Sequence, residues 1–533
     1  METIKKIFNR QTFLKLFVSI TFATINAFLL YGEYNTISII SVWVGSLIIW
    51  YVLTSLALRF LPSFLGYVRK FSEKIDVTID CYLSGKKLFF AIWGIIIIAW
   101  IIPYLALYPG TFGYDSPLEL AYWDGSVEMS DHHPVLHTVL LGFLYDLGCN
   151  WFGAPNGGVV LFCIIQGLIV SSSIAYCIYI MKNKGASSVF VIVALAWVIF
   201  NPYVQSLSFN STKDILFASF FLYFITLFYC HIVEGKSNIP RLIFIFLTGL
   251  LMCLLRHQGV YILFVLLLFV IFAPKKINIK KVRTVIVIVC ILLATETFNY
   301  VIHNVLEYEP GDSREMLSVP MQQMAYVCLL KINDESVYVT DEQLENVEEF
   351  IPEKGILAYN KRSADNVKST FETDIFKDNL GRNIKTYIQL GFQNKKEYLF
   401  AFKNLVSGYL NPEDREYNNL IYEYPFPQLG YTMHRDSILK GYYDFLEGNT
   451  SEMVYKKIPL LSVLYDVGLS IYLLILLVGL CIYRKDYRLW LIILPMLLFL
   501  LSLFLGPAAL IRYIYPLIIL TPFLVFHIIR KAT

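Results

Sequence analysis

The chain has 533 residues, of which 57% are hydrophobic and only 16% are charged, and its formal net charge is +3. A soluble protein carries roughly 25% charged residues, so this composition excludes an ordinary soluble enzyme and predicts an all-α polytopic membrane protein. The small positive charge does not indicate a nucleic-acid partner, because the Lys and Arg residues lie between apolar runs rather than in one patch. Membrane lipid is the expected surrounding.

Apolar runs along the chain predict about twelve transmembrane helices. We expect them at 11–31, 36–58, 87–107, 156–181, 187–206, 213–233, 241–255, 257–273, 283–303, 459–483, 488–505 and 508–530. Two groups of runs divide the chain into a first transmembrane part at 1–303 and a second at 459–533. Between them, before the last three helices, residues 304–458 are long enough for a small extracytoplasmic domain.

Positive charge in the short loops predicts the orientation of these helices. With twelve spans and a cytoplasmic N-terminus, each basic cluster falls in the cytoplasm: Lys5/Lys6/Arg10, the segment from Arg59 to Lys87, Lys182/Lys184, Lys236/Arg241, Lys275 to Arg283, Arg484/Lys485/Arg488 and Arg530/Lys531. A further span at 132–148 would place Lys182 and Lys184 outside, so we expect that segment to be an amphipathic or re-entrant helix at the outer face. Both termini are therefore expected in the cytoplasm of a multi-pass cell-membrane protein.

The first external loop, 108–155, begins with the densest group of titratable residues beside a predicted span. Its first part, YPGTFGYDSPLELAYWDGSVEMSDHHPVLH, contains no Lys or Arg. Pro109-Gly110 and Ser116-Pro117 indicate turns on either side of Asp115. A restrained carboxylate just above the hydrocarbon is suited to general-base catalysis, so we predict that Asp115 is catalytic. The alternative is a turn residue that caps Ser116-Pro117.

Four further loop residues are candidate ligands for a sugar or an acceptor: Glu119, Asp131, His132 and His133. Glu119 lies one helical turn after Asp115, although a solvated helix residue is its more ordinary interpretation. Asp115, Asp131 and one His could hold a divalent cation, but the more ordinary role for Asp131 is the N-cap of the next helix. The sequence leaves a metal ion open.

Three isolated cations stand at the predicted outer ends of spans: Lys213, Arg256 and Arg512. Snorkelling is the ordinary explanation, but Arg and Lys also suit phosphate, so we predict a phosphate-binding role for all three. His257 and Gln258, beside Arg256, are further candidate ligands for a sugar or an acceptor. Deep in the predicted spans, Gln166 and Glu296 are interpreted as packed polar contacts.

Segments of 304–458 such as DEQLENVEEFIP and SADNVKSTFETDIFKDNLGRNIKTYIQLG predict helices, whereas 411–436 predicts an irregular aromatic loop. Only Cys149 and Cys328 fall in segments predicted to be external, so no disulfide framework is expected.

The motifs YPGTFGYDSP, DHHPVLHT, NSTKD, RHQG, SVPMQQ and RYIYP together resemble the GT-C superfamily of membrane glycosyltransferases, and more narrowly a branch found mainly in Gram-positive bacteria. The resemblance implies a GT-C-like fold and inverting transfer of a sugar from a polyprenyl-phosphate-linked donor to a cell-wall glycopolymer or lipid-linked glycan outside the membrane. It also implies that Asp115 is the general base, that Arg512 holds the departing lipid phosphate, and that Lys213 and Arg256 assist. Metal use varies in that superfamily.

The predicted domain before the last three spans departs from the commonest GT-C plan, in which a soluble domain follows the last span. Two other functions fit the same pattern. A polysaccharide polymerase or ligase also uses lipid-linked sugars outside the membrane. A lipid-carrier flippase or transporter would need broken helices and polar groups at mid-membrane.

Overall fold

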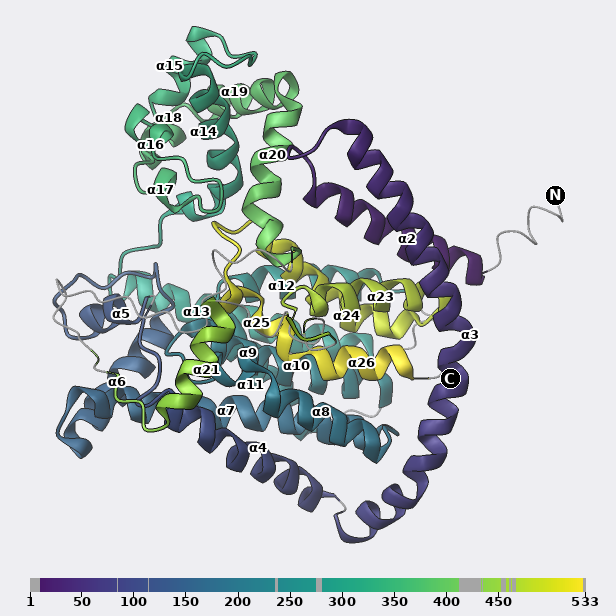
Figure 1. Ribbon diagram of the computed structural model, residues 1–533. Coiled ribbons are helices and arrows are strands. Elements are labelled where there is room, and N and C mark those ends of the chain that lie inside the picture. Colours follow the sequence, from purple (N-terminus) through teal and green to yellow (C-terminus); the bar gives the residue numbers. More distant parts are fainter. Residues whose placement is uncertain are drawn as a thin grey trace.

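Figure 1 shows the computed structural model of the chain, which is built from α-helices. The structure describes residues 10–83, 85–113, 115–234, 238–274, 280–411, 433, 435–451, 457–459, 462 and 466–530. Within these ranges the only β structure is a few isolated bridges. Helices satisfy their own backbone hydrogen bonds, which hydrocarbon requires, and the predicted all-α membrane class is confirmed at this level.

Seven described helices are long and apolar enough to cross a bilayer: α2 (Arg10–Leu29), α3 (Thr36–Tyr82), α4 (Lys86–Ala106), α6 (Val135–Phe152), α7 (Pro155–Asn183), α10 (Lys213–Glu234) and α13 (Lys281–Asn304). An eighth span results if α25 (Ile511–Ile519) and α26 (Thr521–Ile529), bent by 41°, are taken together. The shorter apolar helices are α8 (Ser188–Phe200), α11 (Ile239–Leu255), α12 (Gln258–Phe272), α23 (Leu469–Arg484) and α24 (Tyr487–Leu503). The described chain thus has seven or eight candidate spans.

Two of the predicted continuous spans are broken. The run at 187–206 divides at Asn201, whose side chain accepts hydrogen bonds from the backbone N–H groups of Tyr203 and Val204 and so begins α9 (Pro202–Leu207). Pro202 lacks an N–H group and favours the first turn of the new helix. The run at 508–530 bends between α25 and α26, where Pro522 lies in the first turn of α26.

Helices α3 and α6 differ from the predicted plan. α3 continues for 47 residues, well past the predicted span at 36–58. In its second half, Asp76 accepts hydrogen bonds from Lys182 (2.8 Å) and the Ser188 backbone (2.7 Å) at the turn between α7 and α8. α6 has 18 residues and passes the length and composition test for a span, so the re-entrant position predicted for this segment stays a prediction.

Helix α10 lies at the centre of the apolar bundle and packs against α7, α11, α24 and α25 (Figure 1). Its buried residues cover every face, because the sequence between Ile215 and Ile232 is apolar all round. Its first residue is Lys213, which is thereby fixed at the end of the most buried of the seven long candidate spans among the described residues.

The two deep polar residues have different environments. Gln166 is buried and donates its Nε2 to the carbonyls of Ser208 (3.1 Å) and Asn210 (2.7 Å), so the interpretation as a packed polar contact is confirmed. Glu296 is exposed, and the same interpretation is wrong for it. The reason is that α13 packs on α11 and α12 along one stripe that includes Ile288, Ile291 and Thr295, and Glu296 points away from that stripe.

Residues 313–409 form a helical lobe beside the bundle (Figure 1). It consists of η2 (Ser313–Leu317), α14 (Ser318–Ile332), α15 (Asp341–Glu348), α16 (Glu353–Leu357), α17 (Asp365–Lys368), α18 (Thr373–Asp378), α19 (Leu380–Gln393), α20 (Lys395–Val406) and η3 (Ser407–Tyr409). The lobe has a hydrophobic core of its own around Met324 and Phe350. Most of the predicted aromatic loop at 411–436 lies outside the described residues.

Hydrogen bonds connect the lobe to the start of α25, and connect Arg435 to the start of the first loop. The backbone N–H of Ala364 donates to the Pro507 carbonyl (2.8 Å) and the Tyr409 hydroxyl donates to Ala508 (3.1 Å), just before α25. Arg435, ahead of α21 (Lys440–Ser451), donates to the carbonyls of Leu107 (2.6 Å) and Gly110 (3.2 Å). The segment 304–458 therefore contacts both the start of α25 and the start of the first loop.

Candidate functional site

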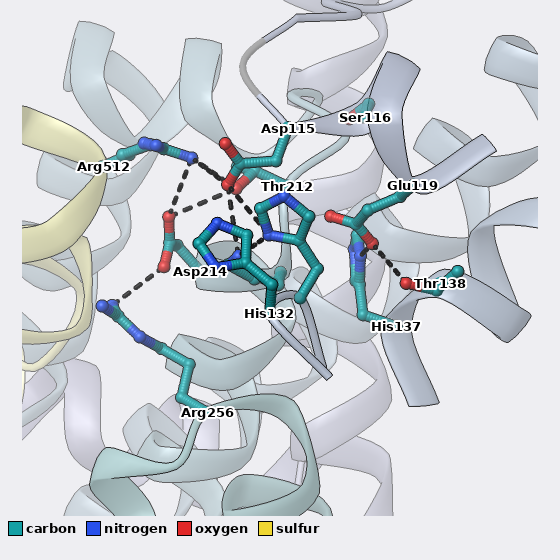
Figure 2. Close-up of polar contacts among 12 residues, drawn as sticks. Asp115, Ser116, Glu119, His132, His137, Thr138, Thr212, Asp214, Arg256 and Arg512 are labelled. Carbon is teal, nitrogen blue, oxygen red and sulfur yellow. Dashed lines mark hydrogen bonds and ion pairs between the residues drawn. The ribbon is translucent and has the colours of Figure 1, made fainter. Parts of the chain in front are cut away.

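Several helix N-termini meet at one end of the bundle. Asp115 directly precedes α5 (Ser116–Trp123), Lys213 begins α10, Arg256 precedes the break that starts α12, and Arg512 lies in the first turn of α25. Figure 2 shows Asp115 and Arg512 pointing toward each other from separate elements, and Arg256 pointing toward Asp214. The N-terminus of a helix carries a partial positive charge, so this end of the bundle favours anions.

Asp115 is the meeting point of three groups. Its Oδ2 atom accepts a hydrogen bond from Arg512 Nη1 at 3.1 Å and lies 3.2 Å from Lys213 Nζ. The Nδ1 atom of His133 lies 3.9 Å from the same oxygen. Asp115 occupies the N-cap position of α5, but its side chain makes no capping hydrogen bond. The structure thus brings Asp115, Lys213 and Arg512 together, and it does not support the turn-capping alternative.

A second carboxylate, Asp214, extends this contact into a chain of alternating charges. Asp214 is fully buried in the first turn of α10. Its carboxylate lies 3.5 Å from Arg512 Nη1 and 2.8 Å from Arg256 Nη1, and it also accepts from the Thr212 hydroxyl at 3.2 Å. The resulting order is Lys213, Asp115, Arg512, Asp214, Arg256.

Arg256 is separated from Asp115, the predicted catalytic residue, by Arg512 and Asp214. Its partner is Asp214, and its guanidinium lies over the rings of Tyr513 (5.2 Å) and Phe217 (5.6 Å). These contacts use the charge and the planar face of Arg256 within the protein. They give Arg256 a position behind Arg512, which it holds in place through Asp214.

His133 is buried and neutral. Its Nδ1 lies 2.6 Å from Lys213 Nζ, which can only donate, so the imidazole carries its proton on Nε2. Burial and the Lys213 charge hold the pKa of His133 well below its ordinary value. The neighbouring His132 is exposed, and its ring centroid lies 4.6 Å from that of His133. Of the two histidines, His132 is therefore the one exposed to solvent.

The surroundings of Asp115 set its proton affinity. Burial alone would raise the pKa of this carboxyl, but the charges of Arg512 and Lys213 reverse the effect and hold the pKa well below its ordinary value. A carboxylate with such a low pKa is a weak base. Asp115 would become a stronger base if Arg512 or Lys213 paired with another anion.

Glu119 is completely buried, and its interpretation as a solvated helix residue is wrong. It lies against His137 Nδ1 and accepts from the Thr138 hydroxyl at 3.3 Å. Both partners belong to α6, which packs against α5 and covers this face. The pair of Glu119 and His137 forms a polar layer directly behind Asp115.

The ligand atoms of Asp115, Glu119 and His133 lie within 4.8 Å of one another, which is close enough for a metal ion. Carboxylate and imidazole ligands suit divalent cations. However, the ammonium group of Lys213 already lies 3.2 Å from Asp115 and 2.6 Å from His133. A second cation in the same space would be repelled, so these residues do not fit a metal ion while Lys213 holds its place.

Asp131 does not cap α6, in contrast to its predicted ordinary role. The N-cap of α6 is Pro134, and no side-chain capping bond is present there. Asp131 instead lies 3.6 Å from His257 Nε2 and 3.3 Å from His303 Nε2. His257 is exposed, and Gln258 is the half-buried first residue of α12. This second polar group therefore joins the first loop to α12 and α13, beside the charge chain.

The sequence reading missed several residues of the site, namely His137, Thr138, Thr212, Asp214, His303 and Tyr513. Asp214 was the easiest of these to predict from the sequence, because an acidic residue directly after Lys213 in an otherwise apolar helix must be paired with a cation. His137 was visible within DHHPVLHT, but its contact with Glu119 depends on the packing of α5 on α6.

Residues 123–533 match the model of DUF6020, a family of unknown function. None of the curated proteins or solved structures compared with the chain matches it. The matched range contains Lys213, Asp214, Arg256 and Arg512 and begins after Asp115. Because this range covers most of the sequence, the chain belongs to the DUF6020 family.

Proposed function

We propose that this protein is a GT-C-like inverting glycosyltransferase that moves a sugar from a polyprenyl-phosphate-linked donor to a cell-envelope acceptor. The observation that carries the proposal is the contact of Asp115 with both Arg512 and Lys213, although Asp115 and Arg512 are 397 residues apart in the sequence. A carboxylate and two cations from different helices provide a proton acceptor and a phosphate site in one place.

In the proposed reaction, an acceptor hydroxyl attacks the anomeric carbon of the donor sugar. The bond between that carbon and the phosphate oxygen breaks, and its electron pair leaves with the lipid phosphate. Lys213 and Arg512 stabilise the negative charge that develops on the phosphate. Asp115 takes the proton of the acceptor hydroxyl. Arg256 acts through Asp214 to position Arg512, and His133 holds the Lys213 ammonium group.

The expected side of the membrane follows from the charges at the other end of the bundle. There Lys184 pairs with Glu234, Arg484 donates to the carbonyl of His527 at 2.7 Å, and Arg530 donates to the Tyr229 hydroxyl at 2.9 Å. A basic end faces the cytoplasm in most membrane proteins. The proposed site is therefore extracytoplasmic, where a cell-wall glycopolymer or a lipid-linked glycan is available as the acceptor.

The test is a transfer assay in proteoliposomes with a panel of polyprenyl-phosphate sugars and a cell-envelope glycan fraction. We expect the wild type to release polyprenyl phosphate and to label the glycan with one donor of the panel. Arg512→Lys should slow this release strongly, because Lys cannot form the bidentate contact with phosphate. Arg382→Lys, in an exposed ion pair of the lobe, is the matched control.

Transfer at the wild-type rate by Arg512→Lys would contradict the role of Arg512. If no donor released polyprenyl phosphate, the result would contradict the proposed glycosyltransferase activity. The products also separate single-sugar transfer from a polysaccharide polymerase or ligase, because the latter two would give long chains or transfer a whole glycan in one step.

A lipid-carrier flippase is the second candidate, and the helix breaks favour it. Arg256 lies at the break between α11 and α12, and Arg512 belongs to the bent pair of α25 and α26. Transporters use discontinuous helices of this kind to bind substrates. Movement of a labelled polyprenyl phosphate across the proteoliposome membrane, without release of sugar, would favour the flippase over the glycosyltransferase.

A further inference from the structure

The chain of alternating charges starts and ends with a cation. Its members are the three cations Lys213, Arg512 and Arg256 and the two carboxylates Asp115 and Asp214. The chain thus has one more positive than negative charge. Charges with little access to water need partners of opposite sign, and nearby helix N-termini add to the positive potential. The Glu119 carboxylate lies within 4.8 Å of Asp115, but its contacts are with His137 and Thr138. The excess positive charge of the chain therefore favours the binding of a further anion.

The two carboxylates are held differently. Asp214 is 0% exposed and is fixed between Arg256 and Arg512. The side chain of Asp115 is 25% exposed, which makes it the more accessible of the two. Asp115 does not stabilise α5 through a cap, so its side chain can turn away without loss of a helix contact. An incoming anion would therefore exchange with Asp115 and leave Asp214 in place.

The contacts of Asp115 resemble those of a bound phosphate oxygen. Arg512 Nη1 and Lys213 Nζ approach the same atom, Oδ2, at 3.1 and 3.2 Å. Figure 2 shows the contact of Arg512 with Asp115. The guanidinium and the ammonium group thus converge on one point from two neighbouring helices, α25 and α10. That convergence is the arrangement that a phosphate group requires.

We propose that Asp115 occupies a phosphate site formed by Lys213 and Arg512, and that the phosphate of a lipid-linked ligand displaces it. This inference rests on the phosphate site of the proposed function and adds the exchange to it. The ligand class is a prenyl monophosphate or its sugar ester. Its phosphate would take the place of Oδ2 between the two cations, and the Asp115 carboxylate would turn toward the accessible side.

The exchange links donor binding to proton acceptance. While Arg512 and Lys213 hold Asp115, its carboxylate is a weak base. Once the two cations share their charge with a phosphate, the carboxylate regains proton affinity next to the bound sugar. Asp115 would then act on an acceptor hydroxyl only when a donor is present.

The experiment measures the affinity of the full-length protein in detergent for farnesyl phosphate, a soluble prenyl monophosphate. If Asp115 competes for the site, Asp115→Asn removes the competing charge and should bind farnesyl phosphate about tenfold more tightly or better. Lys213→Ala should bind it more weakly. Asp146→Asn, on α6 away from the charge chain, should bind like the wild type.

Two further probes identify the source of the binding. Uncharged farnesol should show no gain in affinity with Asp115→Asn, and inorganic phosphate should show the same direction of change as farnesyl phosphate. Equal or weaker binding of farnesyl phosphate by Asp115→Asn would overturn the exchange, as would an equal gain for farnesol. Tighter binding by Asp115→Asn together with no sugar transfer by the wild type would keep the exchange and overturn the glycosyltransferase.

Discussion

At the scale of single residues, the site consists of cations that each contact one or two particular carboxylates. Arg512 is shared by Asp115 and Asp214, while Lys213 is held by Asp115 and His133. Each of these contacts joins residues that are far apart in the sequence. The consequences for stability therefore differ strongly between Asp115, which meets solvent, and Asp214, which does not.

Asp214→Asn should destabilise the protein far more than Asp115→Asn does. Removal of the buried carboxylate leaves Arg256 and Arg512 close together without their shared partner, and loss of one member of a buried ion pair costs about 3–5 kcal/mol. Chemical unfolding in detergent measures the difference. The double variant Asp214→Asn/Arg256→Ala should lose less than the sum of the two single variants. Additive losses would contradict the contact between Asp214 and Arg256.

His133 should make stability depend on pH. Its pKa is held well below the ordinary value of 6.5 in the folded protein. The unfolded chain therefore binds a proton near pH 6.5 that the folded protein does not bind, and stability falls as the pH drops below that value. The variant His133→Gln should show a shallower decline than the wild type between pH 6.5 and the lower pKa of the folded state.

Thermal unfolding of the two proteins across this pH range provides the measurement. Parallel pH profiles of wild type and His133→Gln would show that His133 titrates normally and is not held neutral by burial and Lys213. A His257→Gln variant is the control, since that side chain is 51% exposed and lies against Asp131 rather than Lys213.

At the scale of elements, the packing of α6 on α7 supports the part of the site around Glu119. The two helices approach closely at glycines: a Cβ added to Gly148 would lie 2.3 Å from the Gly157 carbonyl oxygen. Small residues permit such close helix contacts in membranes. The same helix α6 carries His137 and Thr138, which contact Glu119. Gly148 and the two partners of Glu119 thus lie on one helix, whose packing on α7 helps to hold those partners in place.

Gly148→Ala should push α6 away from α7 and destabilise the protein by about 1–3 kcal/mol, the usual loss from an overpacked contact. Gly94→Ala on α4 is the control, because no atom lies within 4 Å of a Cβ at that position. There the substitution should be neutral or slightly stabilising, since Ala favours a helix over Gly. The same effect from both substitutions in unfolding experiments would contradict the close packing of α6 and α7.

Sequence reasoning found the elements better than their ends and contacts. The break at Arg256 was predicted from the distribution of charge and is present between α11 and α12. The break at Asn201 was missed, because a long apolar run hides a capping residue followed by Pro202. The burial of Glu119 was missed because it depends on α6, which lies later in the chain. The spacing of apolar residues within α5 does not show that α6 packs over Glu119.

At the scale of the whole molecule, the chain is an all-α membrane protein with seven or eight candidate spans among its described helices. Composition alone was sufficient for this class, because an apolar chain of this length has few alternatives. Composition was not sufficient for the number of spans, since several apolar helices are broken or short. The orientation in the membrane depends on charges at the two ends of the bundle and is open to a direct test.

Labelling with a membrane-impermeant maleimide tests this orientation. In a background with Cys81, Cys149 and Cys290 replaced by Ser, we expect Ser126→Cys, beside the site, to react in intact cells. Lys485→Cys, at the turn between α23 and α24, should react only after the cells are made permeable. Both positions are exposed. Reaction of Lys485→Cys in intact cells, or protection of Ser126→Cys there, would place the proposed site in the cytoplasm and contradict the extracytoplasmic acceptor.

The transfer rate of Asp115→Asn in proteoliposomes, with the donor that the wild type uses, tests most directly whether Asp115 is the proton acceptor of a sugar-transfer site. Loss of a general base typically lowers a rate by about 10²–10⁴-fold, so we predict a loss of this size while the variant stays folded and inserted. Asp146→Asn should retain the wild-type rate. Transfer by Asp115→Asn at the wild-type rate would remove Asp115 from the mechanism and contradict the account.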